Sequence, residues 1–250
     1  MNIHLDDQGS GPTVVMIHGL GGSANTFEAQ ARALSGSYRV IRPDLPGAAR
    51  SGGNAAKSLE GLADQLAETV AAITPQAYWV GHSLGSVLCQ WVAAKHPEQV
   101  ASLALVGPFW EAPPVVQSAL RQRAERVRAQ GMAAFADEYL GVALAAHTAS
   151  TQPAARAYLR ESLQRTPAEV YATYCELLAA HQAIDLATLH MRTLLVTGDE
   201  DAVSPVALVE RMNGVLPLST MRVLPACGHW APLEAAHELT AVLRDHFARG

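Results

Sequence analysis

Ser83 stands in a sequence context that could make it a nucleophile. It belongs to Gly81-His82-Ser83-Leu84-Gly85, which fits the pattern G-x-S-x-G, directly after the apolar run 77–80 and directly before a helical pattern. A turn from strand to helix strains the serine backbone, and glycines are needed because side chains there would collide with neighbouring backbone. The turn presents the Ser83 hydroxyl above a sheet, beside a helix N-terminus that favours developing negative charge. We therefore predict nucleophilic chemistry at Ser83 rather than a chance match in a loop.

A nucleophilic serine needs two partners further along the chain. Its hydroxyl is a weak nucleophile at neutral pH unless an adjacent base takes the proton, and the base needs a third group to hold its tautomer. His229 follows a glycine near the end of the chain, and Asp199, Glu200 and Asp201 follow the apolar run 193–197. We predict His229 as the base, and each of the three acids is a candidate for the orienting group.

Other reactive side chains are expected to be structural. His82 adjoins Ser83, but successive side chains on a tight turn diverge, so we expect it to pack or hydrogen-bond locally. Cys89, Cys175 and Cys227 are too few and too scattered for a disulfide framework or a zinc site. Cys227 lies close to the histidine, but no base or cation is evident that would make it a reactive thiol. No histidines show metal-ligand spacing, so we expect neither a metal nor a cofactor.

Length and composition favour one compact folded domain. The 250 residues are 49% hydrophobic and 16% charged, which allows a sizeable core. A formal net charge of -5 provides no basic field that would attract nucleic acid. No long apolar run and no basic leader occurs, so we expect no membrane contact and a cytoplasmic location. The sequence leaves the oligomeric state open.

Short apolar runs alternate with helical patterns along most of the chain. Each run is followed by glycine, proline or aspartate and then by helical periodicity, which is typical of βαβ units and a mostly parallel sheet. Their nearly continuous hydrophobicity fits strands that are buried on both faces. The predicted strands are 13–17, 38–41, 77–80, 100–106, 193–197 and 221–224. The predicted helices, which would cover both faces, are 25–35, 59–73, 84–96, 205–215 and 233–248.

The alternation stops between residues 108 and 190, where we predict about four helices and no strand. Thr166 is expected to cap the last of these helices, with Pro167 at its first position. A helical insertion in a βα series is expected to form a lid over the carboxyl edge of the sheet, where open α/β folds bind ligands. The predicted division is a core of residues 1–107 and 191–250 and a lid of residues 108–190.

Four arginines crowd one helix of this insertion, at positions 121, 123, 126 and 128. An anion-binding surface for an acidic substrate is one interpretation. A solvated helix face is favoured, because Gln122 and Glu125 interleave with the arginines and no single face holds all four.

With these motifs, the chain resembles an α/β hydrolase of the lid-bearing carboxylesterase and 3-oxoadipate enol-lactonase type over essentially its whole length. The matching segments are His18-Gly19-Leu20-Gly21-Gly22-Ser23, Asp44-Leu45-Pro46-Gly47, the serine turn, Gly198-Asp199-Glu200-Asp201 and Gly228-His229. The order serine, acid, histidine along the chain is the one that this fold uses. The resemblance implies a mostly parallel sheet of seven or eight strands, helices on both faces and a helical lid.

The resemblance also implies roles for individual residues. It favours Asp201 as the acid, because in similar proteins the acid lies three residues after the glycine and four before a proline, as here. It implies an oxyanion hole made by the backbone N–H groups of Leu20 and Leu84, with His18 bracing that loop.

A substrate pocket is harder to predict than the reacting groups. Phe109, Trp110, Val203 and Trp230 flank the motifs, together with Leu20, and could wall an apolar pocket. Core packing would explain each of them about as well.

The chain departs from the family pattern in three places. Ala49 stands where a glycine is usual after the second long strand, which should alter a structural loop rather than the chemistry. Ser86 stands where a glycine often follows the serine turn, and a small hydroxyl is tolerable there. Similar proteins generally start with one more strand before the segment 3–6, so seven strands are possible here.

The predicted activity is hydrolysis of small-molecule short-chain or aryl carboxylic esters through an acyl-enzyme, without a cofactor. A 3-oxoadipate enol-lactonase or another lactonase is the alternative. A carbon-carbon bond hydrolase and a perhydrolase are less favoured, as is a ligand receptor on the same fold, against which the complete set of three reactive residues argues. Fold resemblance cannot choose between them, because specificity lies in the lid and the pocket.

Overall fold

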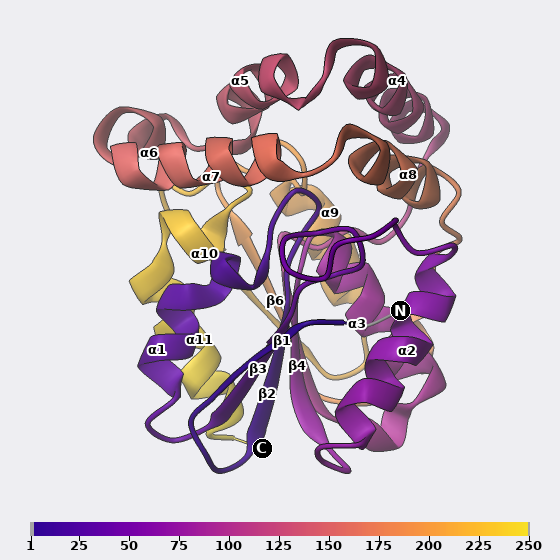
Figure 1. Cartoon of the computed structure of the whole chain (residues 1–250). Helices are drawn as coiled ribbons and strands as arrows, with labels where there is room; N and C mark the ends of the chain where they lie inside the picture. Colours follow the sequence, from indigo (N-terminus) through magenta and orange to yellow (C-terminus); the bar gives the residue numbers. More distant parts are fainter. Residues whose placement is uncertain (1–2, 250) are drawn as a thin grey trace.

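The strands form one seven-stranded sheet (Figure 1). Five of the six predicted runs become its internal strands, whereas the run 221–224 lies in a partly exposed strand at one edge. The structure is a computed structural model that describes residues 3–249. The strands are β1 (Leu5–Gln8), β2 (Thr13–Ile17), β3 (Arg39–Pro43), β4 (Ala77–His82), β5 (Val100–Val106), β6 (Thr193–Gly198) and β7 (Ser219–Leu224). Their order is β1-β3-β2-β4-β5-β6-β7, with β1 antiparallel to β3 and all other neighbours parallel. The predicted fold class, with seven strands, is confirmed.

Pleating of the strands divides their side chains between two buried layers. In β2, Val15 and Ile17 belong to one apolar cluster, and Val14 and Met16 belong to the other. The first cluster includes residues of α2 (Leu59–Ala71), α3 (Leu84–Lys95) and α9 (Val206–Val215), and the second includes residues of α1 (Glu28–Leu34) and α11 (Ala236–Phe247). In Figure 1, α1 and α11 lie to the left of the sheet and α2 and α3 to its right.

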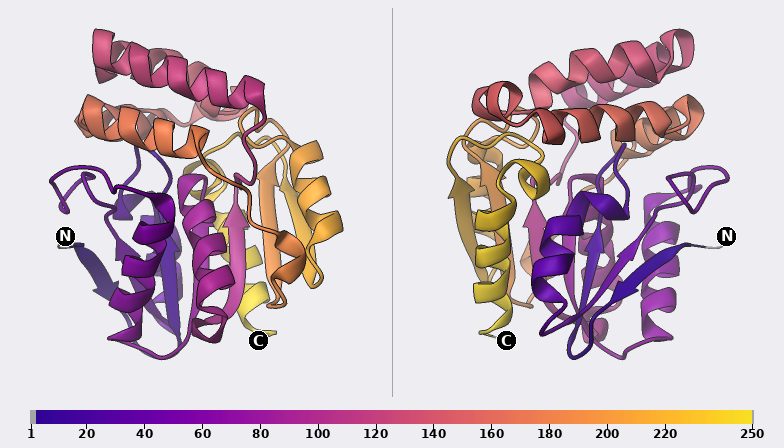
Figure 2. Two further views of the ribbon diagram at one scale, coloured as in Figure 1. Left: turned by 90° about the vertical axis from the view of Figure 1, so that its right-hand side faces the viewer. Right: turned by 60° about the vertical axis from the view of Figure 1, so that its left-hand side comes forward.

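Five helices fill the chain between β5 and β6, one more than predicted. They are α4 (Pro114–Gln130), α5 (Met132–Ala143), α6 (Ala146–Thr151), α7 (Pro153–Arg165) and α8 (Ala168–Ala179). Both views in Figure 2 show them together above the ends of the parallel strands. We call residues 108–190 the helical insertion.

The extra break in the insertion, between α5 and α6, is made by contacts with distant residues. The Ala143 carbonyl accepts a hydrogen bond from the His229 amide (2.8 Å), and the Ala145 amide donates to the Glu234 carboxylate (2.8 Å). These backbone groups therefore bond across the molecule instead of continuing a helix. Local sequence contains no signal for this break, because both partners lie more than eighty residues away along the chain.

The prediction for the start of α8 was wrong in detail. The Thr166 hydroxyl donates to the Ser162 carbonyl at the end of α7 (3.1 Å), and Pro167, not Thr166, is the N-cap of α8. A threonine that follows a helix can bond backward to the carbonyl four residues earlier, and that bond competes with capping the next helix.

The helices of the insertion and of the core are short relative to a bilayer or carry charged residues. Between residues 3 and 249, none is both long enough and apolar enough to cross a membrane.

Candidate active site

Ser83 occupies a sharp turn between β4 and α3. Its φ of 52° and ψ of -115° lie in a region that residues other than glycine rarely adopt. A Cβ on Gly81 would lie 2.3 Å from the Gly85 carbonyl oxygen, and one on Gly85 would lie 2.2 Å from the Ile17 carbonyl oxygen. Only glycine fits at either position, so the two glycines of the motif allow the turn that lifts Ser83 above the sheet.

His229 and Asp201 form a buried hydrogen-bonded pair. The His229 Nδ1 atom lies 3.0 Å and 3.1 Å from the two Asp201 carboxylate oxygens. One of these oxygens also accepts hydrogen bonds from the amides of Val203 (2.8 Å) and Ser204 (2.7 Å). Burial alone would raise the pKa of Asp201, but the imidazole and the two amides hold it below its usual value. Asp201 is therefore an anion at neutral pH.

The other two candidate acids point elsewhere. Asp199 and Glu200 are exposed. The Asp199 carboxylate accepts from the Cys227 amide, and the Glu200 carboxylate accepts from the Ala146 amide. Of the three acids, Asp201 is the one that bonds to His229.

Ser83 and His229 both pack against the end of β5. The Ser83 amide donates to the Val106 carbonyl (3.0 Å), and a Cβ on the next residue, Gly107, would lie 3.0 Å from His229 Nδ1. His82 joins the two segments directly, because its Nε2 atom bonds to the His229 carbonyl at 2.8 Å. Burial lowers the pKa of His82 to about 3, so this imidazole is neutral at neutral pH. The fold thus brings the predicted nucleophile and base to the same edge of the sheet.

The loop after β2 lies against Ser83. A Cβ on Gly19 would lie 3.0 Å from the Ser83 Cβ, which places the adjoining Leu20 beside the nucleophile. Leu84 is the first residue of α3, and the first amides of a helix have no carbonyl partner within it. His18 holds the loop, because its Nδ1 bonds to the Gly19 carbonyl (2.8 Å) and its Nε2 accepts from the Leu45 amide (3.0 Å). Burial lowers the pKa of His18, which keeps it neutral for this second bond.

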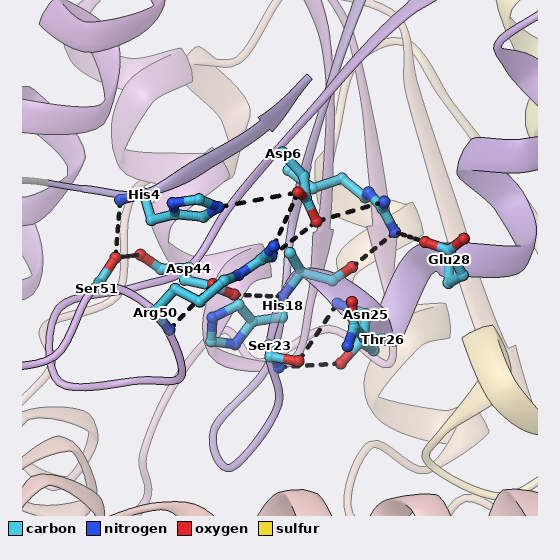
Figure 3. A network of polar contacts seen from close by, with 12 residues as sticks. His4, Asp6, His18, Ser23, Asn25, Thr26, Glu28, Asp44, Arg50 and Ser51 are labelled. Atoms are coloured by element: carbon cyan, nitrogen blue, oxygen red, sulfur yellow. Dashed lines mark hydrogen bonds and ion pairs between the residues drawn. The ribbon is translucent and has the colours of Figure 1, made fainter. Parts of the chain in front are cut away.

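A polar network lies beside His18 (Figure 3). The buried Asp44 carboxylate accepts from the Ala24 amide (2.7 Å) and from the Arg50 guanidinium (2.8 Å). Arg50 also bonds to both carboxylate oxygens of Asp6 on β1, and these bonds lower the pKa of Asp6. Because Leu45 follows Asp44, the network fixes the amide that reaches His18.

The four predicted pocket residues are dispersed around this edge. The Trp230 ring packs 4.9 Å from the His82 ring, and the Val203 amide bonds to Asp201. Phe109 is half-buried and its amide donates to the Ser86 hydroxyl. Trp110 turns toward the end of the insertion, where its indole donates to the Ile184 carbonyl (3.0 Å). Trp110 is therefore held by the backbone near β6 rather than by the Ser83 turn.

Cys227 shows no sign of an activated thiol. Its side chain is buried, and burial raises the pKa of the thiol, as it does for Cys89. Burial also raises the pKa of Cys175, to about 12. Within residues 3–249 no cluster of three or more histidine, cysteine or acidic side chains could hold a metal ion.

Two residues have supporting roles that the sequence did not predict. Glu234, in α10 (Ala231–Glu234), is buried, and its carboxylate accepts from the amides of Gly228 (3.1 Å), Trp230 (2.9 Å) and Ala145. Ser86 accepts from the Phe109 amide and donates to the Ser83 carbonyl (2.6 Å). Both side chains bond to backbone amides or carbonyls. Every residue type has these groups, so no sequence motif marks the partners.

The sequence profile of the α/β hydrolase fold matches residues 12–236. The chain belongs to this family. It is 29% identical over 240 residues, covering 91% of the chain and 92% of its relative, to a pimeloyl-[acyl-carrier protein] methyl ester esterase of Nitrosomonas europaea. The structure matches a thermophilic esterase of Thermogutta terrifontis solved with malate bound, with a TM-score of 0.92, 27% identity and coverage of 99% and 93% of the two chains.

A third similarity concerns the fold alone. The enol-lactonase of Burkholderia xenovorans LB400 matches this α/β hydrolase with a TM-score of 0.90 and 24% identity, covering 98% of this chain and 96% of that one. The predicted resemblance to the carboxylesterase and enol-lactonase type is confirmed at the level of family and fold.

Proposed function

We propose that this α/β hydrolase cleaves carboxylic esters, with Ser83 as nucleophile, His229 as base and Asp201 as orienting acid. The observation that carries the proposal is the buried Asp201–His229 hydrogen bond at the same sheet edge as the strained Ser83 turn. The names of the esterase relatives support ester hydrolysis in particular. The backbone amides of Leu20 and Leu84 are the proposed oxyanion hole.

The reaction follows from the charges at the site. Ser83 Oγ attacks the ester carbonyl while His229 takes its proton, and the carbonyl oxygen becomes an alkoxide that accepts from the two amides. His229 then protonates the departing alcohol, which leaves an acyl-enzyme. Water attacks this intermediate in the same way, with His229 again as base, and releases the acid. We propose the helical insertion as the lid that screens these charges from solvent.

The test is turnover by the variant Ser83→Ala. With p-nitrophenyl acetate as substrate, we expect kcat to fall by about four to six orders of magnitude while the fold remains intact. The exposed Ser10→Ala is the matched control and should behave as wild type. A fluorophosphonate should modify the wild-type protein at Ser83 and leave Ser83→Ala unlabelled. Near-normal turnover by Ser83→Ala would refute the scheme.

The choice between ester and lactone needs a substrate panel. Short-chain esters, longer-chain esters, an enol-lactone and a carbon-carbon bond substrate should be compared on the wild-type enzyme by kcat/KM. Our proposal requires an ester to be the best substrate, and a clear preference for the lactone would replace it with the lactonase alternative.

A further inference from the structure

Arg123 differs from the other three arginines of α4 in its surroundings. Arg126 pairs with Glu138, and Arg128 pairs with both Glu169 and Glu176. Arg121 is exposed, and its side-chain contact among the described residues is a long one to the Gln117 amide oxygen, at 3.5 Å. Arg123 is partly buried instead, and within residues 3–249 no carboxylate lies within ion-pair distance of it. The prediction of a solvated face therefore fits the others but not Arg123.

Aromatic side chains surround the Arg123 guanidinium. Its central carbon lies 5.4 Å from the centre of the Tyr139 ring and 5.7 Å from that of Phe135. The Tyr171 hydroxyl is close enough to interact with it. Burial raises the pKa of Tyr139 and of Tyr171, so both stay uncharged at neutral pH. A guanidinium in such a place keeps its full positive charge and has N–H donors to offer to an anion.

The two tyrosines connect Arg123 to the proposed active site. A Cβ on Gly21, next to Leu20, would lie 3.3 Å from the Tyr171 ring. Tyr139 lies beside the indole of Trp230, which follows His229 in the chain. Each of these two rings thus contacts both the cation and one loop of the proposed active site. Arg123 is therefore linked through one aromatic side chain to each of the loops that carry Gly21 and Trp230.

We infer that Arg123 binds a carboxylate at the far end of the substrate, so that the preferred esters are monoesters of dicarboxylic acids. The inference rests on the proposed ester hydrolysis. The planar guanidinium can donate two parallel hydrogen bonds to a carboxylate, and a partly dry site strengthens such bonds. Glu138 is close enough to act on Arg123 electrostatically, but its carboxylate pairs with Arg126, so a substrate anion would supply the direct ion-pair partner.

The experiment compares matched anionic and neutral esters. The substrates are the p-nitrophenyl monoesters of glutarate and adipate, with p-nitrophenyl pentanoate and hexanoate as uncharged partners of equal chain length. In Arg123→Gln we expect kcat/KM for the anionic esters to fall about 10- to 100-fold, with the neutral esters changed by no more than about threefold. Arg121→Gln removes the same charge from the same helix at an exposed position and should leave both substrates unaffected. Arg123→Lys keeps the charge without the planar fork and should restore part of the loss.

Binding without turnover separates this inference from the proposed function. Calorimetry with the adipate monomethyl ester should show binding to Ser83→Ala that weakens by a similar factor in Ser83→Ala combined with Arg123→Gln. Free adipate should also inhibit wild-type hydrolysis of the hexanoate ester more strongly than hexanamide does. If binding depends on Arg123 but the wild-type protein hydrolyses none of the esters, the proposed ester hydrolysis is wrong and the anion site at Arg123 is supported.

Two results overturn the inference. The first is an equal loss of activity on charged and neutral esters in Arg123→Gln and Arg123→Lys, which would make Arg123 a purely structural residue. The second is binding of the dicarboxylate monoester with the same affinity whether or not Arg123 is present.

Discussion

The bond between His229 and Asp201 decides which imidazole nitrogen is available for chemistry. An ionised carboxylate can only accept hydrogen bonds, so His229 Nδ1 must carry the proton that it shares with Asp201. The lone pair of the neutral ring is then on Nε2, where a base for Ser83 needs it. The two amides on Asp201 strengthen this arrangement, because they stabilise the anion.

Asp201→Asn tests this control of the tautomer. The amide can donate to His229 Nδ1 and so stabilise the ring with its proton on Nε2, the wrong nitrogen. We expect kcat for a good ester substrate to fall by about 10³- to 10⁴-fold with little change in KM. Asp199→Asn is the control, since its amide oxygen can still accept from Cys227 and it does not contact His229. Equal effects in the two variants would remove Asp201 from its proposed role.

At this scale the sequence indicated the three proposed reacting residues and the bracing His18, but not the supporting roles of Glu234 and Ser86. Ser83, Asp201 and His229 each follow an apolar run, and parallel strands end at one edge, so their placement at the same edge of the sheet could be foreseen. Arg123 could not be separated from its neighbours on α4, because its aromatic cage comes from α5 and α8. Ala49 could be predicted in part. The sequence showed that alanine replaces the usual glycine, and the structure adds the reason for that glycine, which is a positive φ of 41°.

Among the elements, the junction of α5 and α6 is bonded directly to the loop that carries His229. Glu234 bonds to the Ala145 amide on this junction and to the Gly228 and Trp230 amides on either side of His229. One buried carboxylate therefore joins the insertion to the histidine loop. Three amide donors on one anion is an arrangement that an uncharged side chain cannot reproduce.

Glu234→Gln should loosen both elements. The glutamine side chain would place its NH₂ group, which can only donate, opposite at least one backbone N–H. Those buried donors would then have no acceptor. We expect a loss of about 2–3 kcal/mol in the free energy of unfolding, measured in urea, together with a lower kcat. The exposed Glu238→Gln on α11 is the matched control and should change stability by no more than about 0.5 kcal/mol. If both variants unfold at the same urea concentration, Glu234 does not hold the junction.

Elements with a local sequence signal could be predicted, and those that depend on distant contacts could not. The central strands are buried on both faces, so their apolar runs are continuous and plain in the sequence. Strand β1 carries Asp6 and Asp7 at the edge of the sheet, where arginines pair with them, and it shows no apolar run. The start of α8 and the break after α5 depend on contacts beyond the local sequence, which periodicity does not record.

Across the whole molecule, buried histidines link stability to pH. Burial lowers the pKa of His82 to about 3 and that of His246 to about 4, whereas an unfolded histidine titrates near 6.5. Between these values the unfolded chain binds protons that the folded chain does not, so stability is fully present above pH 6.5 and is lost as the pH falls toward 4. Each such histidine should contribute a slope of about 1.4 kcal/mol per pH unit in that window.

A series of urea denaturations between pH 7.5 and pH 4.5 checks this expectation. His246→Asn should reduce the slope by about 1.4 kcal/mol per pH unit below pH 6, because one titrating group is removed. His237→Asn, at an exposed position of α11, should leave the slope unchanged. A stability that is flat across this range in the wild-type protein would contradict the burial of these imidazoles.

The hydrogen bonds between the α5–α6 junction and the histidine loop restrict how substrate can enter under the proposed function. The Ala143 carbonyl holds the His229 amide, and Glu234 spans the same gap. If the α5–α6 junction moved away to admit the ester, it would displace His229 or break the hydrogen bonds that position it. His229 could not act as the base in that open state. A substrate that enters between the α5–α6 junction and the histidine loop would therefore have to break these hydrogen bonds. The proposed reaction could begin only after they had re-formed around the bound substrate.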